Sequence, residues 1–138
     1  PPVITLVGAN PLVVAVGGTF ADPGATALDN VDGDLTAQIV VSGGPVVMPA
    51  PGSFTLTYNV SDAALNAAVP VTRTVNVVDQ TPPVITLVGA NPLVLTLGAT
   101  FVDPGATALD NLDGDLTPQI VVSGGPVVTT APGTVTLT

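Results

Sequence analysis

The stretch that decides the fold is FTLTYNVS, residues 54–61. Phe54, Leu56, Tyr58 and Val60 alternate with four small polar residues. Side chains in a β-strand point alternately to opposite faces, so this period of two predicts a strand with one face buried. The stretch therefore predicts a sheet that is covered on one side by the rest of the domain.

The sequence around this strand reads as short strands separated by turns. Val and Thr are abundant, and branched Cβ atoms favour strands, whereas 15 Gly and 15 Pro exclude long helices. We expect strands at residues 3–7, 12–16, 25–28, 38–41, 46–48, 54–61 and 69–78. About seven short strands with turns between them are typical of an all-β immunoglobulin-like (Ig-like) sandwich.

The chain contains a long internal repeat. Residues 1–57 align with residues 82–138 without a gap, and 11 of the 57 aligned positions differ. A period of 81 residues is too long for a stacked solenoid and suits tandem independent domains. We expect a complete Ig-like domain at 1–78, a stiff Pro-rich linker at 79–83, and a truncated second copy at 84–138 that exposes apolar surface.

Four segments carry a resemblance to a known family. They are PPVITLVGANP (1–11), TFADPGATA (19–27), DNVDGDLT (29–36) and RTVNVV (73–78). In this order they resemble a bacterial Ig-like repeat family of the unknown-function type, which also occurs in pesticidal crystal proteins and is similar to hyalin-type repeats. The resemblance implies a secreted or surface-displayed protein. One departure is Leu65, because relatives typically place Gly there, and we expect a remodelled turn.

Two acidic loops hold six of the ten acidic residues. Calcium takes six to eight oxygen ligands, mostly carboxylates and carbonyls, so these loops are candidate calcium sites. The candidate ligands are Asp29, Asn30, Asp32 and Asp34 in copy one and Asp110, Asn111, Asp113 and Asp115 in copy two. Leu35 and Val41 stand where an EF-hand needs Gly and Glu, which excludes that motif. The alternative is that Asp, Asn and Gly serve here only as turn formers.

Arg73 is the only Lys or Arg residue in the chain. It shares the parity of the apolar residues in its strand, so we expect its stem to lie along the sandwich and its guanidinium to meet a carboxylate. An Asp of the acidic loop or Asp62 is the expected partner. We assign Arg73 and Asp62 a structural role.

Composition excludes several function classes. A net charge of −9 argues against nucleic acid and against anionic membranes, since both need basic residues. The apolar runs are too short to span a bilayer. With no Cys there is no disulfide framework, and without His, Cys, Glu or Lys no general base works near neutral pH unless an Asp is strongly shifted. We therefore predict that the protein is not an enzyme.

The leading hypothesis is a structural spacer in a bacterial adhesin-like protein at the cell surface or outside the cell. The chain begins with Pro1 and has no signal peptide, so we expect it to be a piece of a longer protein. Its partners would be neighbouring Ig-like repeats of the same chain. Two alternatives stay open: a module that binds a surface glycan or a protein, and an accessory domain of a secreted hydrolase.

Overall fold

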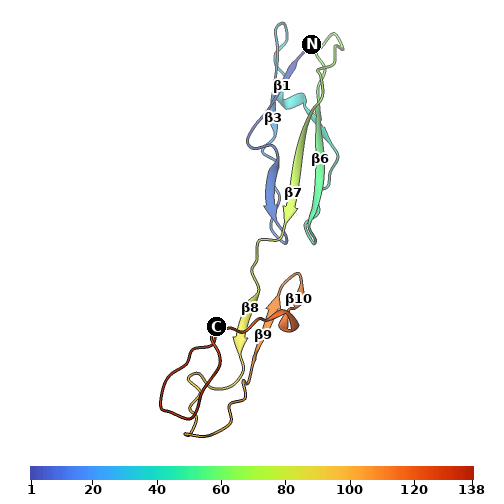
Figure 1. The fold of residues 1–138 in the computed structure, drawn as a ribbon. Helices are drawn as coiled ribbons and strands as arrows, with labels where there is room; N and C mark the ends of the chain where they lie inside the picture. The colour runs from blue at the N-terminus through green and yellow to red at the C-terminus, as the bar shows by residue number, and fades with distance from the viewer. The chain divides into compact units, whose positions relative to one another are not determined.

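The computed structural model describes residues 1–138, which form two compact units, Pro1–Gln80 and Thr81–Thr138. Both units are built from β-strands and turns, with one short 3-10 helix each (Figure 1). No helix of the structure has the length and apolarity that a membrane span needs.

One sheet of unit 1 has three antiparallel strands. They are β1 (Val3–Leu6), β3 (Ala25–Asp29) and β4 (Gly33–Asp34), in the order β1-β3-β4. Gly33 has a φ of +76°, a left-handed conformation that glycine adopts without steric cost. This conformation reverses the chain so that β4 pairs with the end of β3. The acidic loop is thus the turn of a hairpin.

The other sheet of unit 1 has four strands in the order β2-β7-β6-β5. They are β2 (Leu12–Ala15), β5 (Val40–Ser42), β6 (Gly52–Asn59) and β7 (Val71–Val78); the 3-10 helix η1 (Thr36–Gln38) connects β4 to β5. β2 pairs with β7 in parallel, and the other neighbours are antiparallel. Seven strands in two sheets confirm the predicted all-β Ig-like architecture.

The core of unit 1 lies between the two sheets. The predicted alternation is observed: Leu56, Tyr58 and Val60 are all buried. They pack with residues of the three-stranded sheet, among them Ile4 and Ala27. The apolar period of two therefore fixes which face of each strand is covered.

The strand predicted at residues 46–48 is wrong. These residues follow Pro45 and precede Pro49 and Pro51, and no strand forms there. Proline has no backbone N–H, so this segment cannot maintain a ladder of hydrogen bonds. The seventh strand is β4, which lies inside the acidic loop.

An asparagine side chain and a glycine both shape the four-stranded sheet. The side-chain amide of Asn10 donates to the carbonyl of Thr72 (3.0 Å) and accepts from the N–H of Thr74 (2.9 Å). Gly43 follows β5 with a φ of +94°, and a Cβ atom there would lie 2.1 Å from the carbonyl oxygen of Thr55. The backbones of Gly43 and Thr55 therefore approach each other more closely than a residue with a Cβ atom at position 43 would allow.

Unit 2 repeats the three-stranded sheet. Its strands are β8 (Val84–Leu87), β9 (Ala106–Asp110) and β10 (Gly114–Asp115), followed by the 3-10 helix η2 (Thr117–Gln119). The register of β8 with β9 matches that of β1 with β3. Unit 2 has no strand corresponding to β7, and Ile85 is 62% exposed where its counterpart Ile4 is 7% exposed. The predicted exposure of apolar surface in copy two is observed.

Candidate functional site

The acidic loop of unit 1 is held by its own backbone. The Oδ1 atom of Asp29 accepts hydrogen bonds from the N–H groups of Val31 (2.8 Å) and Asp32 (3.1 Å). These two donors lower the pKa of Asp29 below its usual value, because they stabilise the charged carboxylate. The Asp29 side chain is 2% exposed, so its orientation is fixed by the turn and its surroundings.

A second loop, between β6 and β7, supplies Asp62. The two oxygens of Asp62 accept from the backbone N–H and the side-chain amide of Asn66, each at 2.8 Å. The Asn66 side-chain amide is the main cause of the lowered pKa of Asp62. Leu65 in this loop has a φ of +65°. Leu65 thus adopts a left-handed conformation of the kind that glycine adopts without steric cost.

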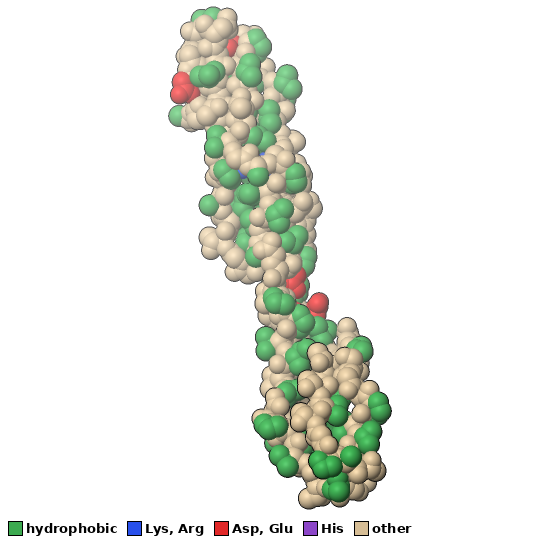
Figure 2. Space-filling view, turned by 60° about the vertical axis from the view of Figure 1, so that its left-hand side comes forward, with side chains coloured by type: hydrophobic (Ala, Val, Ile, Leu, Met, Phe, Trp, Pro, Cys, Tyr) green, Lys and Arg blue, Asp and Glu red, His purple; other side chains and the backbone are tan.

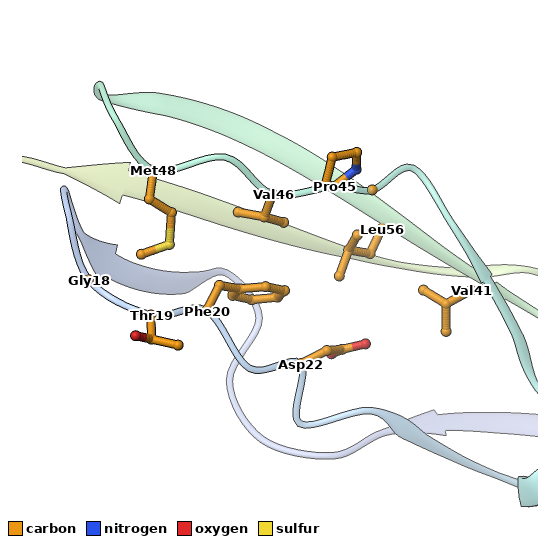
Figure 3. A pocket seen from close by; sticks show the side chains of 10 residues that line it. Gly18, Thr19, Phe20, Asp22, Val41, Pro45, Val46, Met48 and Leu56 are labelled. Carbon is orange, nitrogen blue, oxygen red and sulfur yellow. The ribbon is translucent and has the colours of Figure 1, made fainter.

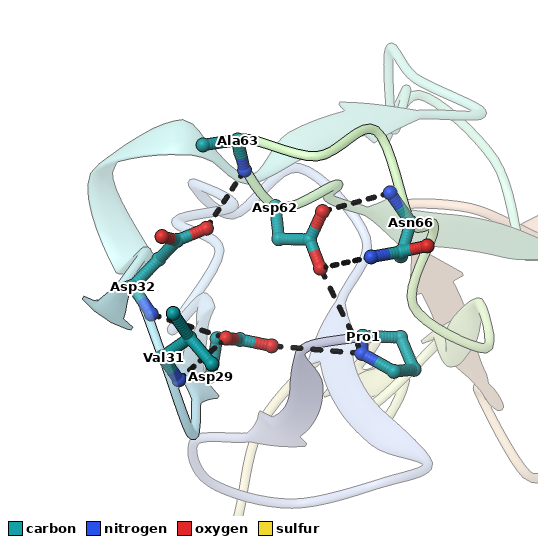
Figure 4. A network of polar contacts seen from close by, with 7 residues as sticks. All are labelled: Pro1, Asp29, Val31, Asp32, Asp62, Ala63 and Asn66. Carbon is teal, nitrogen blue, oxygen red and sulfur yellow. Dashed lines mark hydrogen bonds and ion pairs between the residues drawn. The ribbon is translucent and has the colours of Figure 1, made fainter.

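The two loops meet at one end of unit 1 (Figure 4). The N–H of Ala63 donates to Oδ2 of Asp32 at 2.8 Å, which ties the second loop to the first. One carboxylate oxygen each from Asp29, Asp32 and Asp62 lies within 4.8 Å of the other two. They border a surface hollow of about 420 Å³. Three carboxylates from loops 30 residues apart in sequence thus converge on one point.

A single positive group lies beside these carboxylates. The terminal ammonium of Pro1 is 3.6 Å from Oδ2 of Asp29 and 3.7 Å from Oδ2 of Asp62 (Figure 4). The side chain of Pro1 is 76% exposed, whereas the side chains of Asp29 and Asp62 are 2% and 7% exposed. The ammonium thus approaches the two carboxylates from the solvent side.

The structure brings together only part of the predicted ligand set. Asp29 and Asp32 converge, and Asn30 borders the same hollow. Asp34 lies outside the group: its Oδ1 accepts from the N–H of Thr36 at 2.9 Å, and Thr36 is the main cause of its lowered pKa. Asp34 therefore serves as a turn former. Sequence reasoning gave Asp62 a structural role only, because nothing in local spacing links it to the first loop.

The acidic loop of unit 2 repeats the local geometry. The Oδ1 atom of Asp110 accepts from Leu112 (2.7 Å) and Asp113 (2.9 Å), and these bonds lower its pKa. Asp115 accepts from Thr117 at 2.9 Å and has a lowered pKa for the same reason as Asp34. Asn111 is the first residue of the turn after β9, as Asn30 is after β3. The loop conformation is therefore encoded within the loop itself.

Arg73 lies in the core and not at the acidic loops. It is fully buried, its guanidinium lies 5.9 Å from the centre of the Tyr58 ring, and its Nη2 donates to the carbonyls of Val7 and Gly24. Its nearest carboxylate is Asp22, with 3.6 Å between Nη1 and Oδ1. The expected pairing with Asp62 or the acidic loop is wrong, because the β2–β3 connection brings Asp22 to the middle of the sandwich.

A second hollow of about 590 Å³ opens between the β2–β3 connection and the segment before β6. Phe20, Val46, Met48 and Leu56 supply most of its apolar wall, with Asp22 nearby (Figure 3). Asp22 already accepts a hydrogen bond from Tyr58. The hollow therefore offers an apolar surface with few free polar groups.

The chain is similar to a solved bacterial protein. A comparison with curated protein sequences finds no match. Among solved structures, the lipoprotein BT2262 from Bacteroides thetaiotaomicron is similar, with a TM-score of 0.51 and 30% sequence identity. The similarity covers 59% of this chain and 39% of that lipoprotein, so the chain matches well under half of it.

The match to a family model covers both repeats. The model is that of the Ig-like domain of bacterial surface proteins, and it matches residues 4–77 and 85–138. These two segments include both acidic loops and the strands that carry the core of unit 1. The chain therefore belongs to the family of bacterial surface protein Ig-like domains.

Proposed function

We propose that the chain is a structural spacer in a bacterial surface or secreted adhesin-like protein, in which neighbouring Ig-like repeats form a stalk. The parallel pairing of β2 with β7 carries this proposal. The pairing runs from Leu12–Val75 to Ala15–Val78 and is extended by the N–H of Val16, which donates to the carbonyl of Val78 at 2.9 Å.

This pairing resists tension between the two ends of unit 1. The N-terminus lies at one end of the unit and β7 runs towards the other end (Figure 1). A pulling force therefore acts along the strands, and the hydrogen bonds of β1 with β3 and of β2 with β7 lie across it. They must break together rather than one at a time, which is the property that a spacer under tension needs.

The surface supports a spacer more than a glycan-binding module. Carbohydrate and ligand sites commonly use exposed aromatic side chains with a few polar anchors. Tyr58 is fully buried, and Phe20, Phe54 and Phe101 are each partly covered. The face drawn in Figure 2 carries scattered hydrophobic side chains and few acidic ones. Binding of a glycan or a protein remains the alternative proposal.

Single-molecule stretching of the full chain tests the spacer proposal. Unfolding of unit 1 should lengthen the chain by somewhat less than about 29 nm, from 80 residues at about 3.6 Å each. The Val16→Pro variant removes the N–H that bonds Val78 and should lower the unfolding force. Val16→Ala is the control, because it shortens the side chain and keeps the N–H.

An unfolding force that is the same in Val16→Pro and Val16→Ala would contradict the spacer proposal. Specific binding of the unmodified chain on a glycan array would support the alternative. The two measurements are independent, since an array reports binding without applied force.

A further inference from the structure

We propose that Asp29, Asp32 and Asp62 together bind one calcium ion at the end of unit 1. This three-carboxylate site differs from the set predicted from the acidic loop, since it excludes Asp34 and includes a residue of the β6–β7 loop. It is independent of the spacer role, which rests on β2 and β7.

The spacing of the carboxylates fits one ion. Calcium binds oxygen at about 2.3–2.6 Å, so two ligands on opposite sides of one ion are about 5 Å apart at most. The three oxygens lie within 4.8 Å of one another. A single ion can therefore contact all three side chains, and water from the open hollow can complete its coordination.

A buried oxygen without a hydrogen bond points to a missing partner. The Oδ2 atom of Asp29 is buried and accepts no hydrogen bond, and the positively charged group beside it is the Pro1 ammonium at 3.6 Å. Burying a charged oxygen without compensation is unfavourable. The Oδ2 atom of Asp110 is buried without a hydrogen bond in the same way. The unsatisfied oxygen is thus a property of the turn in both copies, and in unit 1 Asp32 and Asp62 place two further carboxylates beside it.

The ammonium of Pro1 compensates only part of the negative charge of the three carboxylates. This ammonium stands 3.6 and 3.7 Å from two of the three carboxylates, which is too far for a hydrogen bond and close enough for an ion pair. One ammonium leaves most of the charge of three carboxylates uncompensated. A divalent cation would balance it more fully and would bind Oδ2 of Asp29 directly.

The carboxylates are oriented before any ion binds. Backbone N–H groups hold Oδ1 of Asp29 and Oδ2 of Asp32, and Asn66 holds Asp62. Calcium tolerates irregular coordination, whereas magnesium requires near-octahedral geometry and keeps its water. A site on two surface loops therefore suits calcium. We expect a dissociation constant of about 0.1–1 mM, the range of extracellular calcium modules.

The test is a calcium chloride titration of the full chain followed by amide NMR. Saturable shifts are expected at the amides of Val31, Asp32, Ala63 and Asn66, because these groups bond to the proposed ligands. Sodium chloride at matched ionic strength and magnesium chloride are the reference titrations. The absence of saturable calcium shifts at these amides would overturn the proposal.

Matched variants assign the ligands. Asp29→Asn and Asp32→Asn keep an oxygen that accepts the backbone N–H groups and remove the charge, so calcium binding should weaken at least about tenfold. Asp34→Asn makes the same change of charge in the same loop, outside the site, and should leave binding unchanged. Equal affinities in the Asp29→Asn and Asp34→Asn variants would overturn the proposed site.

A further variant tests the competition with Pro1. Adding one Thr before Pro1, as Thr81 precedes Pro82, converts the proline nitrogen into an uncharged amide. Calcium should then bind more tightly than to the chain with a free Pro1, because no ammonium competes for Asp29 and Asp62. Weaker binding after this addition would contradict the proposed position of the ion.

Discussion

The hydroxyl of Tyr58 donates a 2.7 Å hydrogen bond to Oδ1 of Asp22, the same oxygen that faces the guanidinium of Arg73. Burial of Tyr58 raises its pKa to about 12, and the acceptor carboxylate of Asp22 adds to the shift. A tyrosine in water has a pKa near 10. The folded state therefore holds this proton more tightly than the unfolded state.

This difference predicts a loss of stability at high pH. Between pH 10 and about 12 the unfolded chain loses the Tyr58 proton while the folded chain keeps it, so stability is complete below pH 10 and falls as the pH rises towards 12. The chain has one Tyr and no Trp, so ultraviolet absorbance follows this group alone. In Asp22→Asn the midpoint should move towards 10. An unchanged midpoint would show that Asp22 has no part in the shift.

Replacing Arg73 by Met should destabilise unit 1 strongly. The change removes the ion-pair partner of Asp22 and the donor to the carbonyls of Val7 and Gly24. Losing these two buried hydrogen bonds and the ion pair costs on the order of 3 kcal/mol. Urea unfolding measures the loss. Arg73→Lys is the control. Its stability should lie between those of the unmodified chain and Arg73→Met, because Lys keeps the charge without the paired donors of the guanidinium.

Leu65→Gly should stabilise the β6–β7 loop. Leu65 is 85% exposed, so its side chain contributes little packing, and its φ of +65° is unfavourable for a residue with a Cβ atom. Relief of this strain, less the greater entropy of Gly in the unfolded chain, should raise stability by up to about 1 kcal/mol. Ala64→Gly is the control and should lower stability slightly. A lower melting temperature for Leu65→Gly would contradict the strain.

Gly43→Ala should be far more damaging than Gly17→Ala. Both glycines have positive φ, at +94° and +72°, but only at Gly43 would a Cβ atom meet the carbonyl of Thr55. Gly17→Ala should cost about 1 kcal/mol for its conformation alone. Gly43→Ala also forces β5 and β6 apart and should cost about 3 kcal/mol or more. Equal losses of stability for the two variants in urea unfolding would mean that the backbones at residues 43 and 55 can move apart at no cost.

The fold was predictable where one strand carries its own pattern. The alternation of residues 54–61 identifies β6 and its buried face, and Gly and Pro mark the turns around it. The short strand β4 has no such pattern, since Gly33 and Asp34 form a strand only because the preceding turn returns them to β3. Residues 46–48 show the opposite case: their apolar composition suggested a strand, and the flanking prolines prevented it.

The acidic site was predictable only in part, for a related reason. The local turn around Asp29 follows from the types and order of its residues, and the loop of copy two has the same hydrogen bonds. The approach of Asp62 depends on how the β6–β7 loop packs against the hairpin of the other sheet. Contacts between loops that are distant in sequence are set by tertiary packing, which spacing along the chain does not reveal.

The side chain of Asn10 bears on how near-identical repeats avoid pairing with one another. Because its amide bonds both Thr72 and Thr74, it occupies backbone groups of β7 beyond the end of the β2 ladder. Free groups on a strand invite a strand from another molecule, and a neighbour of almost the same sequence would fit well. By bonding Thr72 and Thr74, Asn10 leaves fewer free backbone groups on this side of β7 for a strand of another molecule to pair with.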